Sequence, residues 1–240
     1  MIRHWDWSET SQTVSVFCRE AGLVRGVAKG AKREKSNFSG GLELMTRGEV
    51  LASVKNADTL ALLTAWDLLE IFPAVRGTLR SFHSGMFMLD LVQHAVRELD
   101  PHPAVYDALL AGLRGLGSAR GDRSAVLGVL WSVLADTGHM PELTADVRTG
   151  EPLAAAGTYV FDAAHGGLTA DRAQPGAWRV RAETVDLLRA MRDQGHVASA
   201  FPEETLDRAI RLLALVFREV FSVEPRSARA YFGGELDPRR

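Results

Sequence analysis

The sequence is poor in the residues from which disulfides and metal sites are built. Its 240 residues include a single cysteine, Cys18, which excludes an internal disulfide and a zinc site made of thiolates. The seven histidines are scattered, and none has a second histidine and a glutamate at the spacing of a metalloprotease. We therefore expect neither a bound metal nor another cofactor.

Long apolar runs are also missing. No stretch approaches the roughly 18 to 20 apolar residues that a helix needs to cross a bilayer. Residues 1–6 lack the uninterrupted apolar segment of a secretory signal. These absences predict a cytoplasmic protein with no membrane partner.

Catalytic motifs are equally scarce. The stretch Gly26–Lys32 is rich in glycine and lysine, but it lacks the Gly-Lys-Ser/Thr triplet of a phosphate-binding loop. Asp162 lies three residues before His165, a spacing that is common by chance, and no serine has the context of a nucleophile elbow. No residue is singled out as catalytic, and we expect the protein not to be an enzyme.

What the sequence does contain is a concentration of positive charge. The whole chain has a net charge of −2, yet the segment from Arg19 to Lys35 holds six cations against the two acids Glu20 and Glu34. A local field of one sign on an otherwise acidic chain is typical of a phosphate-binding site, although a solvated loop explains the same charges. The candidate DNA-binding residues are Arg19, Arg25, Lys29, Lys32, Arg33 and Lys35.

The first third of the chain predicts β-structure. Strands are expected over residues 13–18 and 23–28, and one or two more over residues 42–54, interrupted near Arg47 and Gly48. Short strands with glycine-rich turns favour a small barrel, and such barrels bind single strands through a cationic groove with aromatic platforms. The candidate platforms are Trp5, Trp7, Phe17 and Phe38. For Trp5 and Trp7, which would point the same way on a strand, burial in the barrel or its interface is the alternative.

From about residue 58 the apolar residues recur at helical spacing. Helices are expected over residues 59–71, 81–99, 104–116, 124–135 and 183–192, with a last helix from Pro202. In the second of these the buried stripe is predicted to be Phe82, Met86, Leu89, Val92, Val96 and Leu99. In the last it is predicted to be Leu206, Ile210, Leu213, Phe217 and Val220. Residues 141–175 read as turns and short strands, including Thr158–Phe161.

Several of these segments resemble the RecO family of bacterial recombination mediators. The similar segments are the Gly-Glu-Thr-Ser-like turn Ser8–Ser11, the basic stretches Arg19–Gly22 and Gly26–Lys32, the entry to the insert Gly138–Leu143, and the basic ending Pro225–Tyr231. The resemblance spans nearly the whole chain and is most specific in the barrel. It implies an α+β protein with an N-terminal OB-fold β-barrel over residues 1–57 and an α-helical domain over residues 58–240. That domain would carry a small zinc-finger-like insert at residues 141–178.

The chain departs from the family pattern in two places. Many RecO proteins carry two Cys-x-x-Cys pairs in the insert, and the matching positions here are Asp146, Thr149, Thr169 and Arg172. Without thiolates a tetrahedral zinc site is implausible, so the insert is expected to be held by packing around Tyr159, Val160, Phe161 and Leu168. The chain also begins close to the Ser8–Ser11 turn, so the first strand is expected to be short, or the natural start to lie upstream.

The resemblance implies a DNA repair and recombination mediator. Such a protein binds single- and double-stranded DNA, anneals complementary strands and helps to load recombinase together with RecR and the C-terminal tail of the single-strand-binding protein. Arg226 and Arg229 are secondary candidates for DNA contact, with surface solvation as the alternative. The competing hypothesis is a docking scaffold with little DNA binding of its own. A third, an unrecognised hydrolase, has no sequence feature in its favour.

Overall fold

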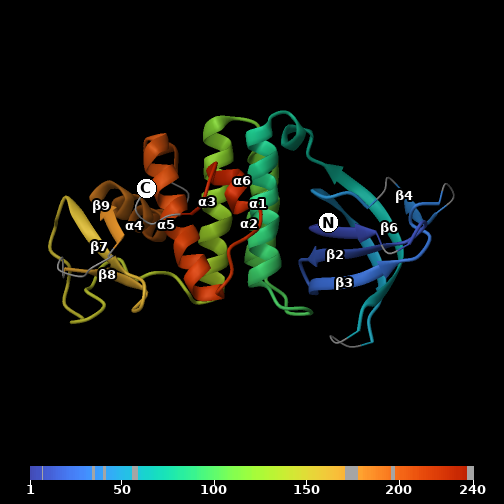
Figure 1. The fold of residues 1–240 in the computed structure, drawn as a ribbon, viewed down its shortest axis with the longest axis horizontal. Coiled ribbons are helices and arrows are strands. Elements are labelled where there is room, and N and C mark those ends of the chain that lie inside the picture. The colour runs from blue at the N-terminus through green and yellow to red at the C-terminus, as the bar shows by residue number, and fades with distance from the viewer. Residues whose placement is uncertain are drawn as a thin grey trace.

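The computed structural model describes residues 1–6, 8–33, 36–39, 42–55, 59–170, 178–195 and 198–236. A β-sheet unit lies at one end of the molecule, a group of helices lies in the middle, and the small β-sheet of the insert lies at the other end (Figure 1). This arrangement confirms the predicted α+β class. Among the described residues, no helix is both long enough and apolar enough to cross a membrane.

The N-terminal sheet joins six strands in the order β1-β2-β3-β6-β4, and β5 also pairs with β6. The strands are β1 (Arg3–Asp6), β2 (Gln12–Cys18), β3 (Gly22–Ala28), β4 (Phe38–Ser39), β5 (Thr46–Ser53) and β6 (Ala61–Ile71). The first three form an antiparallel meander, β3 and β6 are parallel, and β5 and β6 are antiparallel. The predicted interruption near Arg47 and Gly48 is confirmed as a register shift in β5.

Strand pairing leaves the sheet open between β1 and β5, and Met1 spans this gap. The amino group of Met1 donates to the carbonyl of Thr46 at 2.8 Å, and its carbonyl accepts from the amide of Met45 at 3.1 Å. The sheet thus curls towards closure without a continuous ladder, which is consistent with an OB-like fold. The expected short first strand is present, because β1 has four residues.

The helix expected over residues 59–71 is wrong, because this segment forms β6. Its alanines and leucines favour a helix locally, but residues Leu62–Ile71 pair with β5 and Ala61–Leu63 pair with β3. These ladders satisfy the backbone of three strands at once, which outweighs the local preference. The sheet therefore extends to Ile71, beyond the domain boundary expected at residue 57.

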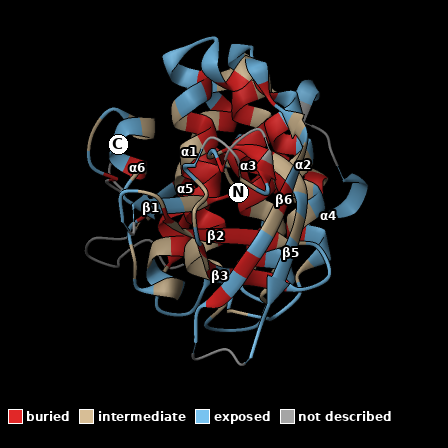
Figure 2. Ribbon diagram, turned by 90° about the vertical axis from the view of Figure 1, so that its right-hand side faces the viewer, coloured by how far each residue is buried: buried red, intermediate tan, exposed pale blue. Residues whose placement is uncertain are grey.

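Two hydrophobic cores meet where the sheet contacts the helices. Val14, Val16, Leu63 and Trp66 are among the buried residues inside the sheet. Ile2, Phe17 and Leu23 belong instead to the larger core that runs through the helical domain. Figure 2 shows buried stretches on β2 and β3 and on the helices behind them. The sheet is thus packed on the helices by its own apolar side chains.

The remaining predicted helices are confirmed, with shifted ends. They are α1 (Leu79–Ala95), α2 (Pro103–Gly115), α3 (Ala119–Asp136), α4 (Ala182–Gln194) and α5 (Glu203–Phe221), with α6 (Ala228–Phe232) and two short 3-10 turns, η1 (Pro73–Arg76) and η2 (Ala198–Ala200). Three residues of the predicted stripes are wrong: Phe82 is 40% exposed, and Leu99 and Val220 are each 37% exposed. Leu99 fails because α1 ends before it, whereas Phe82 and Val220 lie near helix ends, where a stripe runs off the core.

The insert is a three-stranded sheet in the order β8-β7-β9. Its strands are β7 (Thr158–Asp162), β8 (Gly167–Thr169) and β9 (Trp178–Arg181). The predicted core of this insert, Tyr159, Val160, Phe161 and Leu168, is buried. The ring of Trp178 stacks on Phe161 with centroids 5.3 Å apart. Packing thus contributes to holding the insert, as expected.

Candidate nucleic-acid interface

The basic segment after β3 forms a loop that is docked on the β1–β2 turn. The amide of Lys32 donates to the carbonyl of Thr10 at 3.1 Å, and the amide of Gly30 donates to the hydroxyl of Ser11 at 3.2 Å. Gly30 has a φ of +70°, a left-handed conformation that glycine adopts without strain. We call residues 29–33 the basic loop. Its path is fixed by backbone contacts, which leaves the cationic side chains available for other partners.

The three cations of this loop, Lys29, Lys32 and Arg33, are all exposed, and Lys29 and Arg33 are considered first. Across the described part of the chain, neither side chain has an acidic partner within ion-pair distance. The side chain of Arg33 lies over Gly30, and its Cδ is 3.4 Å from the position that a Cβ on Gly30 would occupy. Two unpaired cations held on one loop attract an anion to it.

Lys32 is the third cation of the loop, and it is partly neutralised. Its Nζ lies 2.6 Å from a carboxylate oxygen of Asp6, at the end of β1. The hydrogen bond from Lys32 holds the pKa of Asp6 below its ordinary value. Both side chains are in contact with solvent, so this pair is weak and can exchange for a phosphate.

Arg19 and Arg25 are placed differently, because both hold the sheet to the helical domain. Arg19 donates from Nε and from a second nitrogen to the two carboxylate oxygens of Asp107 in α2, each at 2.9 Å. Arg25 forms an ion pair with Glu98, which follows α1. The acids that occupy them are far away in sequence, so no local signal could have revealed these pairs.

The structure therefore brings together only part of the predicted set. Lys29, Lys32 and Arg33 share one loop, whereas Arg19 and Arg25 lie on the side that contacts the helices. Lys35 lies outside the described residues. Of the predicted cations, the basic loop is the group best placed for phosphate contact.

The aromatic candidates also divide. Phe17 and Phe38 are each 5% exposed and belong to the hydrophobic cores, so their prediction as stacking platforms is wrong. Both side chains are apolar, and their burial in a core is favoured because it removes apolar surface from water. Trp5 is 45% exposed, and Trp7 lies outside the described residues. Trp5 therefore remains as a platform, and sequence reasoning did not single out Arg3, whose guanidinium lies over its ring at 5.4 Å.

A groove of about 1180 Å³ lies elsewhere on this unit, between the sheet and α2. Its lining includes Arg19 but also Glu20, Glu49, Asp67 and Asp107. Arg47 lines the groove as well. Both arginines are paired with acids, Arg19 with Asp107 and Arg47 with Glu70, so this mixture of charges does not favour a polyanion. The exposed basic loop remains the better candidate.

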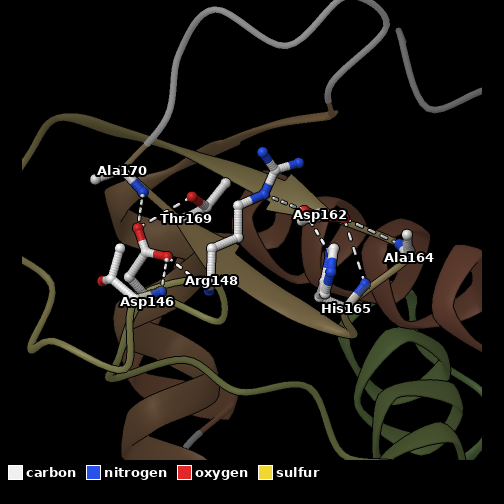
Figure 3. A network of polar contacts seen from close by, with 8 residues as sticks. Asp146, Arg148, Asp162, Ala164, His165, Thr169 and Ala170 are labelled. Atoms are coloured by element: carbon white, nitrogen blue, oxygen red, sulfur yellow. Dashed lines mark hydrogen bonds and ion pairs between the residues drawn. The ribbon is translucent and has the colours of Figure 1, made fainter.

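In the insert, three of the four positions matched to thiolates, Asp146, Thr149 and Thr169, belong to one hydrogen-bonded network around Asp146 (Figure 3). One carboxylate oxygen accepts from the amides of Arg148 and Thr149 at 2.8 and 3.3 Å. The other accepts from the hydroxyl of Thr169 at 3.0 Å and the amide of Ala170 at 2.7 Å. The carboxylate of Asp146 therefore links its own turn, residues 146–149, to the end of β8 at residues 169–170. Arg172 lies outside the described residues, and within them no three metal-binding side chains gather.

Asp162 and His165 form a second hydrogen-bonded network beside the first. Asp162 accepts from Nε of Arg148 at 2.7 Å and contacts Nδ1 of His165 at 2.9 Å. It also accepts from the amides of Ala164 and His165, at 3.1 and 3.3 Å. Burial raises the pKa of Asp162, but these hydrogen bonds and charges outweigh it and leave the pKa lowered. The pair thus fixes the turn between β7 and β8.

Acid should weaken the insert through Asp146. The amides of Ala170 and Arg148, with smaller contributions from Thr169 and Thr149, lower the pKa of Asp146 from 3.8 to about 2. Because the folded-state pKa is below the unfolded one, the carboxylate stabilises the fold above pH 3.8 and loses this effect as pH falls through about 2. We expect the amide of Ala170 to lose protection from hydrogen exchange over that range.

The variant Asp146→Asn provides the control. An amide side chain keeps one acceptor oxygen and does not titrate, so the variant should be less stable at neutral pH and lose less stability on acidification than the parent chain. The two proteins are compared by thermal unfolding at a series of pH values. An identical acid dependence in both would show that Asp146 does not hold the insert.

Comparison with known proteins covers both parts of this structure. The model for "Recombination protein O N terminal" matches residues 1–72, and the model for "Recombination protein O C terminal" matches residues 76–228. The division between them falls just after β6, where the sheet ends.

Three relatives, each called DNA repair protein RecO, show the extent of the similarity. The protein of Verminephrobacter eiseniae (strain EF01-2) is 34% identical over 200 residues, which cover 78% of this chain and 76% of the relative. That of Delftia acidovorans (strain DSM 14801 / SPH-1) is 30% identical over 229 residues, covering 90% and 87%. That of Anaeromyxobacter dehalogenans (strain 2CP-C) is 29% identical over 203 residues, covering 83% and 80%. The chain belongs to the RecO family of DNA repair proteins.

Proposed function

We propose that this protein binds single- and double-stranded DNA through the basic loop and anneals complementary strands as a recombination mediator. The observation that carries the proposal is the loop itself, with Lys29 and Arg33 unpaired in the described structure and Lys32 paired only with Asp6 at the surface. Annealing requires no covalent chemistry. It requires that the repulsion between two phosphate backbones is neutralised while the bases stay free to pair.

Membership of the RecO family supports the proposed location and partners. We place the protein in the cytoplasm at the nucleoid, where it acts without a metal or another cofactor and without enzymatic turnover. It assists recombinase loading together with RecR and with the C-terminal tail of the single-strand-binding protein. The competing proposal is a docking scaffold with little DNA binding of its own. It is supported by the ion pairs of Arg19 with Asp107 and of Arg25 with Glu98, because paired arginines contribute less positive charge for binding DNA.

A matched pair of double variants separates the two proposals. Lys29→Ala with Arg33→Ala removes two unpaired cations, and Arg19→Ala with Arg25→Ala removes two paired ones. Both variants change the net charge equally. We expect annealing of two complementary oligonucleotides to slow at least several-fold in the first variant and to change little in the second, because only the first loses phosphate contacts.

Annealing is followed by fluorescence quenching between labelled strands, with thermal unfolding of each variant as the folding control. Equal rates for the parent chain and the Lys29/Arg33 variant, with both folded, would favour the scaffold. A larger loss in the Arg19/Arg25 variant would move the DNA site to the face that contacts the helices.

A further inference from the structure

Two carboxylates lie side by side where β5 pairs with β6. Glu49 of β5 is directly opposite Asp67 of β6 in the strand register, and both side chains are exposed. Residues opposite one another on neighbouring strands have their Cβ atoms only about 5 Å apart, and like charges at such positions destabilise a sheet. The fold therefore loses some stability by carrying two acids here.

Neither carboxylate is neutralised by the part of the chain that the structure describes. No lysine or arginine there lies within ion-pair distance of Glu49 or Asp67. Arg47, two residues before Glu49 on β5, pairs instead with Glu70, whose carboxylate oxygen lies 3.4 Å from its Nε. Arg114 of α2 lies 2.7 Å from the same oxygen. The arginine of β5 is thus engaged with another acid, and the repulsion between Glu49 and Asp67 remains.

Exposed leucines flank the two acids along the strands. Leu51 lies two residues after Glu49 on β5 and is 67% exposed, and Leu69 lies two residues after Asp67 on β6 and is 50% exposed. Because β5 and β6 are antiparallel, one leucine lies on each side of the acidic pair, about 7 Å along its strand. We call Glu49, Leu51, Asp67 and Leu69 the acidic–apolar patch.

The acidic–apolar patch borders the groove between the sheet and α2. All four of its residues line this groove of about 1180 Å³, together with Tyr106 and Leu110 of α2. The lining holds four acids against two arginines and is therefore negative overall. Small-molecule sites measure roughly 300 to 1,000 Å³, so the size of the groove favours a peptide segment over a small ligand.

We propose that the acidic–apolar patch binds a segment of a partner protein that presents a lysine or arginine between apolar side chains. The cation lies between Glu49 and Asp67, where it replaces their repulsion with two attractions, and the apolar side chains cover Leu51 and Leu69. Exposed apolar surface that is grouped in this way marks an interaction site. The same two acids repel a phosphate backbone, so this surface differs in chemistry from the basic loop and does not depend on DNA binding.

The experiment measures the fluorescence anisotropy of three labelled nine-residue peptides with the full chain. The first has a central lysine between two leucines, with serine and glycine elsewhere. The second has glutamate in place of the lysine, and the third has serine in place of the leucines. We expect the first to bind about tenfold more tightly than the others, because the second meets two like charges and the third buries no apolar side chain.

Glu49→Gln with Asp67→Asn should weaken binding of the lysine peptide about tenfold, since both attractions are lost. The same variant should unfold at a higher temperature than the parent chain, because a pair of like charges is removed from the sheet. Glu151→Gln with Glu204→Gln changes the net charge equally, at two exposed acids outside the groove, and should leave binding unchanged.

Leu51→Ser with Leu69→Ser tests the apolar part and should weaken binding to a similar extent without a change in charge. Equal binding of the lysine and glutamate peptides to the parent chain overturns the inference, and this comparison needs no variant. Equal binding by the Glu49/Asp67 and Glu151/Glu204 variants overturns it as well. So does displacement of the lysine peptide by oligothymidine, which would assign the surface to DNA, or self-association of the chain that the leucine variant abolishes, which would assign it to a second copy.

Discussion

Gly22→Ala should lower the free energy of unfolding by about 3 kcal/mol or more, the largest effect expected from any single methyl group in the barrel. Gly22 has a φ of +68°, and an added Cβ would overlap the carbonyl group of Asp100 and lie 2.7 Å from its amide nitrogen. These are backbone atoms and cannot rotate away. The substitution therefore forces apart the sheet and the segment after α1.

This contact is where β3 is joined to the helical domain. The amide of Leu99 donates to the carbonyl of Leu23 at 3.0 Å, and Arg25 pairs with Glu98 nearby. Chemical denaturation measures the expected loss. Gly166→Ala is the control, since Gly166 has a similar φ of +70° with no atom within 4 Å of an added Cβ, and should cost only about 1 kcal/mol of strain. Equal losses for the two variants would mean that the close approach to Asp100 does not matter.

The second large effect is expected from removing the basic loop's three cations together. The variant Lys29→Ala with Lys32→Ala and Arg33→Ala loses three phosphate contacts. Each contact contributes about 0.7 to the slope of log K against log salt, so the slope becomes smaller by about 2. At 0.1 M salt, that difference corresponds to about 100-fold weaker binding of a single strand. The backbone contacts of the loop with Thr10 and Ser11 do not involve these side chains, so the unfolding temperature should change little.

Local patterns in the sequence predicted the elements whose structure is decided locally. Val14 and Val16 alternate with polar neighbours and lie in β2 with buried side chains. Leu206, Ile210 and Phe217 recur at helical spacing and are fully buried in α5. In both cases the spacing of the apolar residues follows the period of the element, so the periodicity carries the information, although Phe17 on the other face of β2 is buried as well.

The β6 segment shows where this reasoning fails. Its leucines have a high helical preference, and its buried residues, Ala61, Leu63 and Trp66, do not alternate strictly because the pairing with β5 contains register shifts. A bulge of this kind disturbs the period-2 pattern. The sheet partners that decide the outcome cannot be found from the segment alone.

The sequence predicted the candidate site as a cluster of cations, and the structure shows which of these cations are paired and which are free. The local excess of cations indicated the basic loop, but the partners that engage Arg19 and Arg25 lie in and before α2, far along the chain. The absence of thiolates in the insert was visible in the sequence, whereas the hydrogen bonds that join Asp146 to Thr149 and Thr169 were not. Asp146 and Gly150, four residues later, are residue types that favour turns, and Gly150 does have a positive φ. This signal would have indicated the turn that follows Asp146.

The central claim is that the basic loop grips the phosphate backbone, and salt dependence tests it most directly. The measurement is the association constant for a single strand at several salt concentrations, for the parent chain and for the variant without the three loop cations. We predict a straight, steep fall of log K with log salt in the parent chain and a slope smaller by about 2 in the variant. Two lines of equal slope, from proteins that unfold at the same temperature, would contradict the claim.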